Sequence, residues 1–202
     1  PQIASDRAGG AYVVWVRGSA KLYAQHVRSD GSLAYGGSGQ QIAAGNGANI
    51  AMCDDGAGGA FVAWEYSTDV YANHLLSGGP QQGSSGRVID GSRSLQRFPA
   101  VCDDGNGGCF IAWQSGASIP YAIYAQRLDA GGNPQWNTPG ILIFKRVCGT
   151  CTGANAGHVA VCRDRQQLML AWEVTSVVSS SDTQNIMASR IRCSTATDTT
   201  MV

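Results

Sequence analysis

The apolar residues of this 202-residue chain fall in short runs of four to seven positions, and each run is bounded by Gly, Asp, Asn or Ser. Runs of this length, rich in Val, Ile, Tyr and Trp, predict β-strands, and no stretch has convincing helical spacing. In the run AFVAW (60–64) both alternating faces are apolar. Such a strand is covered on both sides. We therefore expect an all-β fold built from short, sandwiched strands.

A pattern of four segments recurs along the chain. Its marker is a tryptophan that ends the second segment, which reads GGAYVVW, GGAFVAW, GGCFIAW and QQLMLAW, so that the structural repeat lies at Trp15, Trp64, Trp113 and Trp172. A segment before it reads PQIASD, NIAMCDD, PAVCDD and HVAVCRD, and a segment after it reads LYAQHV, VYANHL, IYAQRL and IMASRI. A fourth begins GQQI, GRVI or GILI in three copies. Four strands in about 45 residues are typical of a β-propeller blade.

The repeats predict a single β-propeller domain, 1–202, made of four four-stranded antiparallel blades. Their approximate limits are 1–45, 46–92, 93–145 and 146–202. Four blades fit a closed four-blade ring, or part of a larger or assembled propeller. Because an unclosed array leaves strand edges exposed, we favour closure.

The best-preserved copy, 103–143, contains D-G-x-G-G-x-x-x-A-W, then I-Y-A-Q-R-L-D-x-x-G-x-x-x-W, then G-x-x-I. This pattern resembles repeats of large secreted bacterial propeller-like proteins, and its four copies cover essentially the whole chain. The resemblance implies scaffold repeats in an extracellular or cell-surface location. The turn also resembles, more faintly, the Asp-box of sialidases, but Trp64 and Trp113 come nine residues after Asp55 and Asp104, too far for that motif. We therefore assign no sialidase active-site residues to this chain.

The near-identical stretches CDDGAGG (53–59) and CDDGNGG (102–108) occupy the same place in two repeats. We interpret them as tight turns between the first and second strands, in which Asp bonds the backbone two residues on and Gly supplies positive φ. A calcium loop is the alternative. It is disfavoured because D-D-G lacks alternate-position oxygens and a downstream Glu. We expect no metal and no cofactor.

Charge and composition narrow the choice of partners. The net charge is zero and the pI about 7.2, which leaves no basic field for nucleic acid or anionic lipid. No run of 18 apolar residues exists, so the chain is not expected to span a membrane. Charged residues make up only 14% of the chain, which suits a secreted protein or one buried in an assembly. The start at Pro1, without Met or a leader, suggests a processed or truncated N-terminus.

Seven cysteines favour an oxidising compartment. Cys148 and Cys151 form CGTC, for which a redox motif, half of a zinc site and a loop disulfide are the alternatives, and we favour the disulfide. Cys102 and Cys109 flank one hairpin turn and are a second candidate pair. Since seven is odd, at least one thiol stays free or pairs with another chain, and Cys193 is our candidate.

Variation among the connections between strands is concentrated on one face. With strands A to D counted from the inside, the A–B turns are short and nearly constant, whereas the B–C and D–A connections differ widely in length. Loops on a rigid scaffold commonly carry binding residues, although unselected drift in loop length is an equal alternative. The polar residues of this candidate binding face are Arg17, Glu65, Arg93, Arg97, Gln114, Lys145, Arg146 and Glu173.

One catalytic hypothesis follows from the two glutamates of the chain, Glu65 and Glu173, which each follow the repeated Trp directly. In a closed four-blade ring they stand opposite each other, and glycoside hydrolysis needs two carboxylates about 5–10 Å apart. Val16 and Gln114 hold the equivalent positions, which favours a tolerant site at the strand end. No Ser–His–Asp set can be assembled.

Histidine and arginine interchange at one position of the third strand, which holds His26, His74, Arg127 and Arg190 in the four copies. This interchange suits side chains that reach from a blade to water better than it suits a catalytic base.

The sequence thus predicts an extracellular, non-catalytic propeller that binds glycan or protein through its variable B–C/D–A face. One alternative is a structural subunit of an extracellular filament or surface assembly, whose partners are copies of itself. A second is a glycoside-acting enzyme that uses Glu65 and Glu173.

Overall fold

The computed structural model describes residues 1–18, 21–91, 95–116, 121–145, 155–165, 167–178, 181–194 and 198–201. These residues form antiparallel strands and no helix, and so no membrane-spanning helix is found among them. The first sheet contains β1 (Gln2–Ser5), β2 (Ala11–Arg17), β3 (Lys21–Val27) and β4 (Gln40–Asn46). The second contains β5 (Ala48–Asp54), β6 (Ala60–Tyr66) and β7 (Asp69–Leu76), and both β8 (Gly79–Pro80) and β9 (Arg87–Val88) pair with β7.

The third and fourth sheets repeat this order. The third contains β10 (Gln96–Asp103), β11 (Cys109–Ser115), β12 (Ala122–Leu128) and β13 (Ile141–Lys145). The fourth contains β14 (Asn155–Asp164), β15 (Gln167–Val178), β16 (Ser181–Ser194) and β17 (Asp198–Met201). The all-β propeller architecture of four antiparallel blades is confirmed.

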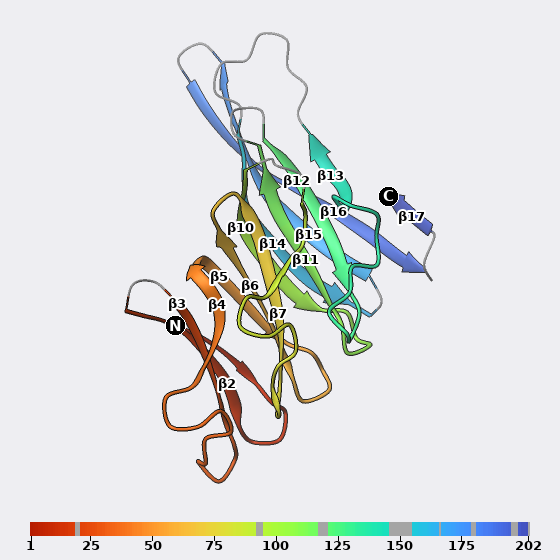
Figure 1. Ribbon diagram of the computed structural model, residues 1–202. Coiled ribbons are helices and arrows are strands. Elements are labelled where there is room, and N and C mark those ends of the chain that lie inside the picture. The colour runs from red at the N-terminus through yellow and green to blue at the C-terminus, as the bar shows by residue number, and fades with distance from the viewer. Residues whose placement is uncertain are drawn as a thin grey trace.

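The four sheets stack in an open row and do not form a ring. The inner strands contact one another in the order β1, β5, β10, β14, and the first and fourth sheets lie at opposite ends of the row (Figure 1). The expected closed four-blade ring is therefore wrong. Closure would place the inner strand of the fourth sheet beside that of the first, whereas these two sheets lie at opposite ends of the row (Figure 1).

Each sheet buries an apolar face against the next sheet. Between the first two sheets, Tyr12 and Val14 pack with Val62 and Trp64 in one cluster of buried residues. Equivalent clusters fill the other two interfaces. Both faces of a central sheet are therefore covered, which explains why its strands are apolar on both sides.

The repeated tryptophan is buried in the second, third and fourth sheets and half-buried in the first. Trp64 and Trp113 are fully buried, and each stacks on a tyrosine of the neighbouring strand. The ring centroids of Trp64 and Tyr71 lie 6.0 Å apart, within the range of favourable aromatic pairs. Gly86, at the start of the fourth segment, lies directly against the Trp64 indole, so the Gly of GRVI is explained by this close approach.

Gly86→Val is expected to destabilise the protein by about 2–4 kcal/mol, because it combines overpacking with a backbone conformation that favours glycine. A Cβ at Gly86 would lie 2.4 Å from Trp64 Cη2, and the φ of this residue is +69°. Urea denaturation followed by circular dichroism measures the loss. The matched control is Gly37→Val, where a Cβ meets nothing within 4 Å. Equal losses for both variants would contradict this role for Gly86.

The D-G-x-G-G stretches form the predicted tight turns between the first and second strands. Asp55 Oδ1 accepts hydrogen bonds from the amides of Ala57 (2.7 Å) and Gly59 (2.8 Å). Asp6 and Asp104 make the same pair of bonds in their own turns. The second carboxylate of each turn is thus a local cap for the backbone.

The first aspartate of each D-D pair has a different role. Asp54 Oδ1 lies 2.6 Å from Arg7 Nε of the first sheet, and Asp103 Oδ1 lies 2.7 Å from Arg163 Nε of the fourth sheet. These ion pairs join neighbouring sheets at the turn end. Because the partners are partly exposed, the pairs guide alignment more than they stabilise.

The repeated basic residue of the third strand is also explained by the turns. His26 Nε2 lies 2.9 Å from Asp6 Oδ2, His74 Nε2 lies 2.8 Å from Asp55 Oδ2, and Arg127 binds Asp104. Both histidines are buried, so the expectation that they reach water is wrong. The carboxylate that caps the turn needs a donor for its second oxygen, and the third strand supplies it.

The contacts of Asp55 change its acidity. Burial raises the pKa of this carboxyl, but the hydrogen bonds from Ala57, His74 and Gly59 outweigh burial and hold the pKa below its ordinary value of 3.8. Folding therefore favours the ionised form. Stability from this difference is present above the unfolded-state pKa and is lost as the pH falls through 3.8 towards the folded-state value.

The melting temperature is accordingly expected to fall as the pH is lowered from about 5 to about 3. The Asp55→Asn variant is expected to be less stable at neutral pH. Its melting temperature should fall less steeply as the pH is lowered, because the carboxylate that caps this turn is gone. Thermal melts at several pH values measure both effects, with Asp69→Asn as the control at a carboxylate that caps no such turn. An unchanged acid slope in Asp55→Asn would refute the linkage.

Candidate functional site

The inner strands of three sheets share an irregularity at the end opposite the capped turns. Their pairing with the second strand shifts register between Ala48 and Ala51, between Arg97 and Ala100, and between Gly157 and Ala160. Such β-bulges often lie next to functional sites, where they redirect a side chain. The same bulge in three sheets is therefore a feature of the repeat.

One residue inside each bulge has a positive φ although it is not glycine. These residues are Asn49 (45°), Phe98 (52°) and His158 (44°). Non-glycine residues adopt this conformation at a cost, and such residues cluster at ligand-binding and active sites. The three side chains therefore mark one end of the inner strands as the candidate site.

Glu65 lies beside two of these bulges. Its Oε1 accepts a hydrogen bond from Asn49 Nδ2 at 2.7 Å and a second from the backbone amide of Phe98 in the third sheet. The carboxylate is thereby fixed in orientation. It also joins the second sheet to the third.

Glu173 lies beside the bulge of the fourth sheet. Its Oε2 is 3.5 Å from His158 Nδ1, and the side chains of His158 and Glu173 are 73% and 30% exposed. The ring centroids of His158 and Phe98 lie 5.1 Å apart. A continuous set of contacts therefore runs from Glu65 through Phe98 and His158 to Glu173, and we call these residues with Asn49 the bulge site.

The bulge site combines two carboxylates with an imidazole and an aromatic ring. Two carboxylates about 5–10 Å apart are the usual catalytic pair of glycoside hydrolysis, and an aromatic face stacks on a sugar ring. The open row removes the closed-ring placement in which Glu65 and Glu173 would stand opposite each other, since they belong to the second and fourth sheets and the third sheet lies between them. In the part of the chain that the structure describes, no group of three or more His, Cys, Asp or Glu side chains could hold a metal ion.

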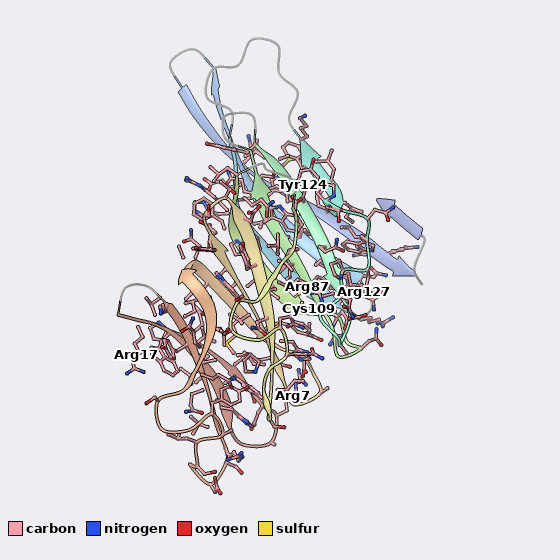
Figure 2. The ribbon with its side chains drawn as sticks, in the orientation of Figure 1. Arg7, Arg17, Arg87, Cys109, Tyr124 and Arg127 are labelled. Atoms are coloured by element: carbon pink, nitrogen blue, oxygen red, sulfur yellow. The ribbon has the colours of Figure 1, made fainter. Side chains whose placement is uncertain are left out.

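The other predicted site residues are dispersed. Arg97 is exposed and lies next to Phe98, opposite the buried Gln114. Lys145 ends the outer strand β13. Arg17 lies at the edge of the first sheet (Figure 2), 5.2 Å over the Tyr23 ring. Arg93 and Arg146 lie outside the described residues.

Sequence reasoning missed Asn49, Phe98 and His158. All three stand four residues before the repeated cysteine of the inner strand, at Cys53, Cys102 and Cys162. The constant spacing to the cysteine could have identified this position in the sequence. It was overlooked because the three residues are of different types.

The proposed disulfide between Cys102 and Cys109 is wrong, since both thiols are free. Cys109 pairs with Asp103 in the ladder, so Cys102, one residue earlier, points to the opposite face of the third sheet. The two residues belong to different interfaces. Burial, the main cause, raises the pKa of the Cys102 thiol to about 12. Cys148 and Cys151 lie outside the described residues, as does the side chain of Cys193.

Comparison with known proteins is informative at the level of the fold. No family model and no curated protein sequence matches this chain. Its structure is similar to an exo-1,5-α-L-arabinanase from a bovine ruminal metagenomic library, with a TM-score of 0.52 and 10% identity over 96% of this chain and 74% of that one. It is also similar to an endo-1,5-α-L-arabinanase from Thermotoga petrophila, with a TM-score of 0.53 and 14% identity over 100% of this chain and 58% of that one.

These matches define the class of protein as a β-propeller with the fold found in glycoside hydrolases. They contradict the expectation of a non-catalytic scaffold and the expectation that the chain is not an enzyme. Of the alternatives that the sequence left open, the glycoside-acting enzyme agrees best with this fold.

Proposed function

We propose that this chain is an extracellular glycoside-acting propeller that binds a polysaccharide at the bulge site and cleaves its glycosidic bonds. The observation that carries the proposal is the placement of Glu65 and Glu173, the two glutamates of the chain, at one end of the inner strands with Phe98 and His158 between them. The resemblance to secreted bacterial repeat proteins supports the extracellular location.

The two carboxylates differ in ways that suit different tasks. Glu65 is held by two donors to one oxygen, which fixes the orientation that a nucleophile or a base needs. Glu173 lies in the more open part of the site beside His158, which can exchange a proton with it. We therefore assign Glu65 as the base or nucleophile and Glu173 as the acid that protonates the leaving oxygen.

The substrate class that we propose is a pentose polysaccharide with α-1,5-linked arabinose, because the enzymes of similar fold act on such chains. The Phe98 ring offers a face on which a sugar can stack, and Arg97 and Asn49 offer donors to sugar hydroxyls.

A panel of polysaccharides tests the proposal. The protein is incubated with arabinan, xylan and cellulose, and released sugars are separated by anion-exchange chromatography. We expect oligosaccharides from arabinan and none from cellulose. A folded protein that releases no sugar from any of these substrates would overturn the proposal.

A further inference from the structure

Tyr66 is a partly exposed aromatic residue at the same end of the second sheet as Glu65. It is the last residue of β6, directly after Glu65, and it is 37% exposed. The Glu65 carboxylate accepts a hydrogen bond from the third sheet, so the side chain of Glu65 lies on the side of β6 that faces that sheet. Since side chains alternate along a strand, Tyr66 lies on the other side, which faces the first sheet.

The other copies of the repeat have no aromatic residue at the position of Tyr66. The second residue after the repeated tryptophan is Arg17 in the first copy, Ser115 in the third and Val174 in the fourth. Among the residues that the structure describes, Tyr66 belongs to none of the three apolar clusters between the sheets. The packing of the sheets therefore does not explain why a tyrosine stands here.

The Tyr66 ring is held in place by its neighbours. Its centroid lies 5.7 Å from that of Tyr71, with an angle of 63° between the ring planes, and Tyr71 stacks on the buried Trp64. On the first sheet, Gly45 lies directly against the Tyr66 ring, and a Cβ at this glycine would overlap the ring. The ring is thus positioned before a ligand binds, which lowers the entropic cost of binding.

The ring lies beside the bulge site. Tyr66 and Glu65 are consecutive, and neighbouring sheets pack about 10 Å apart, so the step from the ring to the Glu65 carboxylate is short enough for one sugar chain to bridge. Val16 is 46% exposed at the corresponding end of the first sheet, on the face where Val14 packs with Trp64. A partly exposed apolar surface therefore continues the bulge site towards the first sheet.

We propose that Tyr66 is a platform on which a sugar residue of the polysaccharide stacks, so that one sugar chain crosses the end of the second sheet from Tyr66 to Glu65. This inference rests on the proposed function and adds a second binding position to it. The C–H groups of a sugar ring pack on an aromatic face, and the tyrosine hydroxyl exchanges hydrogen bonds with sugar hydroxyls. Tyr66 contributes to binding and takes no part in the chemistry.

Isothermal titration calorimetry with arabinohexaose tests the platform in the Glu173→Gln protein, the parent, which is expected to leave the oligosaccharide intact during the titration. Tyr66→Ala in this parent is expected to weaken binding about 3–10-fold, the size of one aromatic contact. Tyr66→Phe keeps the ring face and should bind within about twofold of the parent. With Glu173 in place, initial rates on arabinan should show a higher KM for Tyr66→Ala and an unchanged kcat, because only binding is lost.

Gly45→Ala is a second variant, which leaves Tyr66 in the chain. The added methyl group must displace the Tyr66 ring, so this variant is also expected to bind arabinohexaose more weakly than the parent. Leu33→Ala is the control, because it removes a side chain that is 45% exposed at the other end of the first sheet, where Leu33 pairs with Val27. It should bind like the parent. Thermal melts verify that every variant is folded.

The possible results separate the platform from the proposed function. If the parent binds arabinohexaose and Tyr66→Ala binds it equally well, the platform is wrong and the proposed function stands. If the folded parent binds no arabinohexaose, both are wrong. If Tyr66→Ala and Gly45→Ala weaken binding but the wild type releases no sugar from arabinan, the platform stands and the catalytic part of the proposed function is wrong.

Discussion

Trp64→Ala is expected to destabilise the protein by about 3–5 kcal/mol, the usual loss when a large aromatic side chain is removed from a core. Trp64 is fully buried, stacks on Tyr71 and contacts Gly86. Its removal therefore leaves a cavity between the first and second sheets. Since small domains are stable by about 5–15 kcal/mol in total, this one change removes a large share of the stability.

The repeat supplies a matched control for this experiment. Trp15 occupies the same position in the first sheet but is only half-buried, so Trp15→Ala is expected to cost about 1–2 kcal/mol. Urea denaturation followed by far-ultraviolet circular dichroism compares the two variants. Equal losses would contradict the assignment of the first sheet to an open end of the row.

Glu65→Gln and Glu173→Gln are each expected to lower kcat/KM on arabinan by about 10²–10⁴-fold, the range for loss of a catalytic acid or base. Glutamine keeps the size of the side chain and one oxygen acceptor, so the hydrogen bonds from Asn49 and Phe98 to position 65 can persist. Thermal melts should therefore change little. The loss then reports on chemistry and not on folding.

Initial rates of sugar release measure this effect. Asp30→Asn is the control, because Asp30 caps an exposed turn of the first sheet and is expected to leave the rate unchanged. Full activity in either glutamine variant would remove that glutamate from the catalytic pair.

The strand pattern and the repeated tryptophan could be predicted from the sequence because they depend on local periodicity. AFVAW is apolar at every position, and the structure covers both faces of β6. The role of the D-D-G turns was also predictable, since an Asp side chain bonds amides only two and four residues away.

Contacts between residues far apart in the sequence were harder to predict. The pairing of His74 with Asp55 joins residues 19 positions apart, and nothing in either segment indicates that the imidazole is buried. The closure of the ring depends on the angle between sheets, which no single repeat encodes. Both errors arose where contacts between residues far apart in the sequence, and not the pattern along one strand, decide the outcome.

The candidate site, too, could be predicted only in part from the sequence. Glu65 and Glu173 were visible because they are the two glutamates of the chain and share a repeat position. Phe98 and His158 were not visible, because a bulge changes side-chain direction by shifting the pairing of two strands, and one strand alone does not reveal the shift.

A crystal structure of the Glu173→Gln variant with an arabino-oligosaccharide tests the central claim most directly. The account predicts a sugar ring in contact with the side chains of Glu65 and of residue 173, with Phe98 or His158 beside it. A sugar bound elsewhere, for example on the Trp15 and Tyr23 rings of the first sheet, with the bulge site empty, would contradict it.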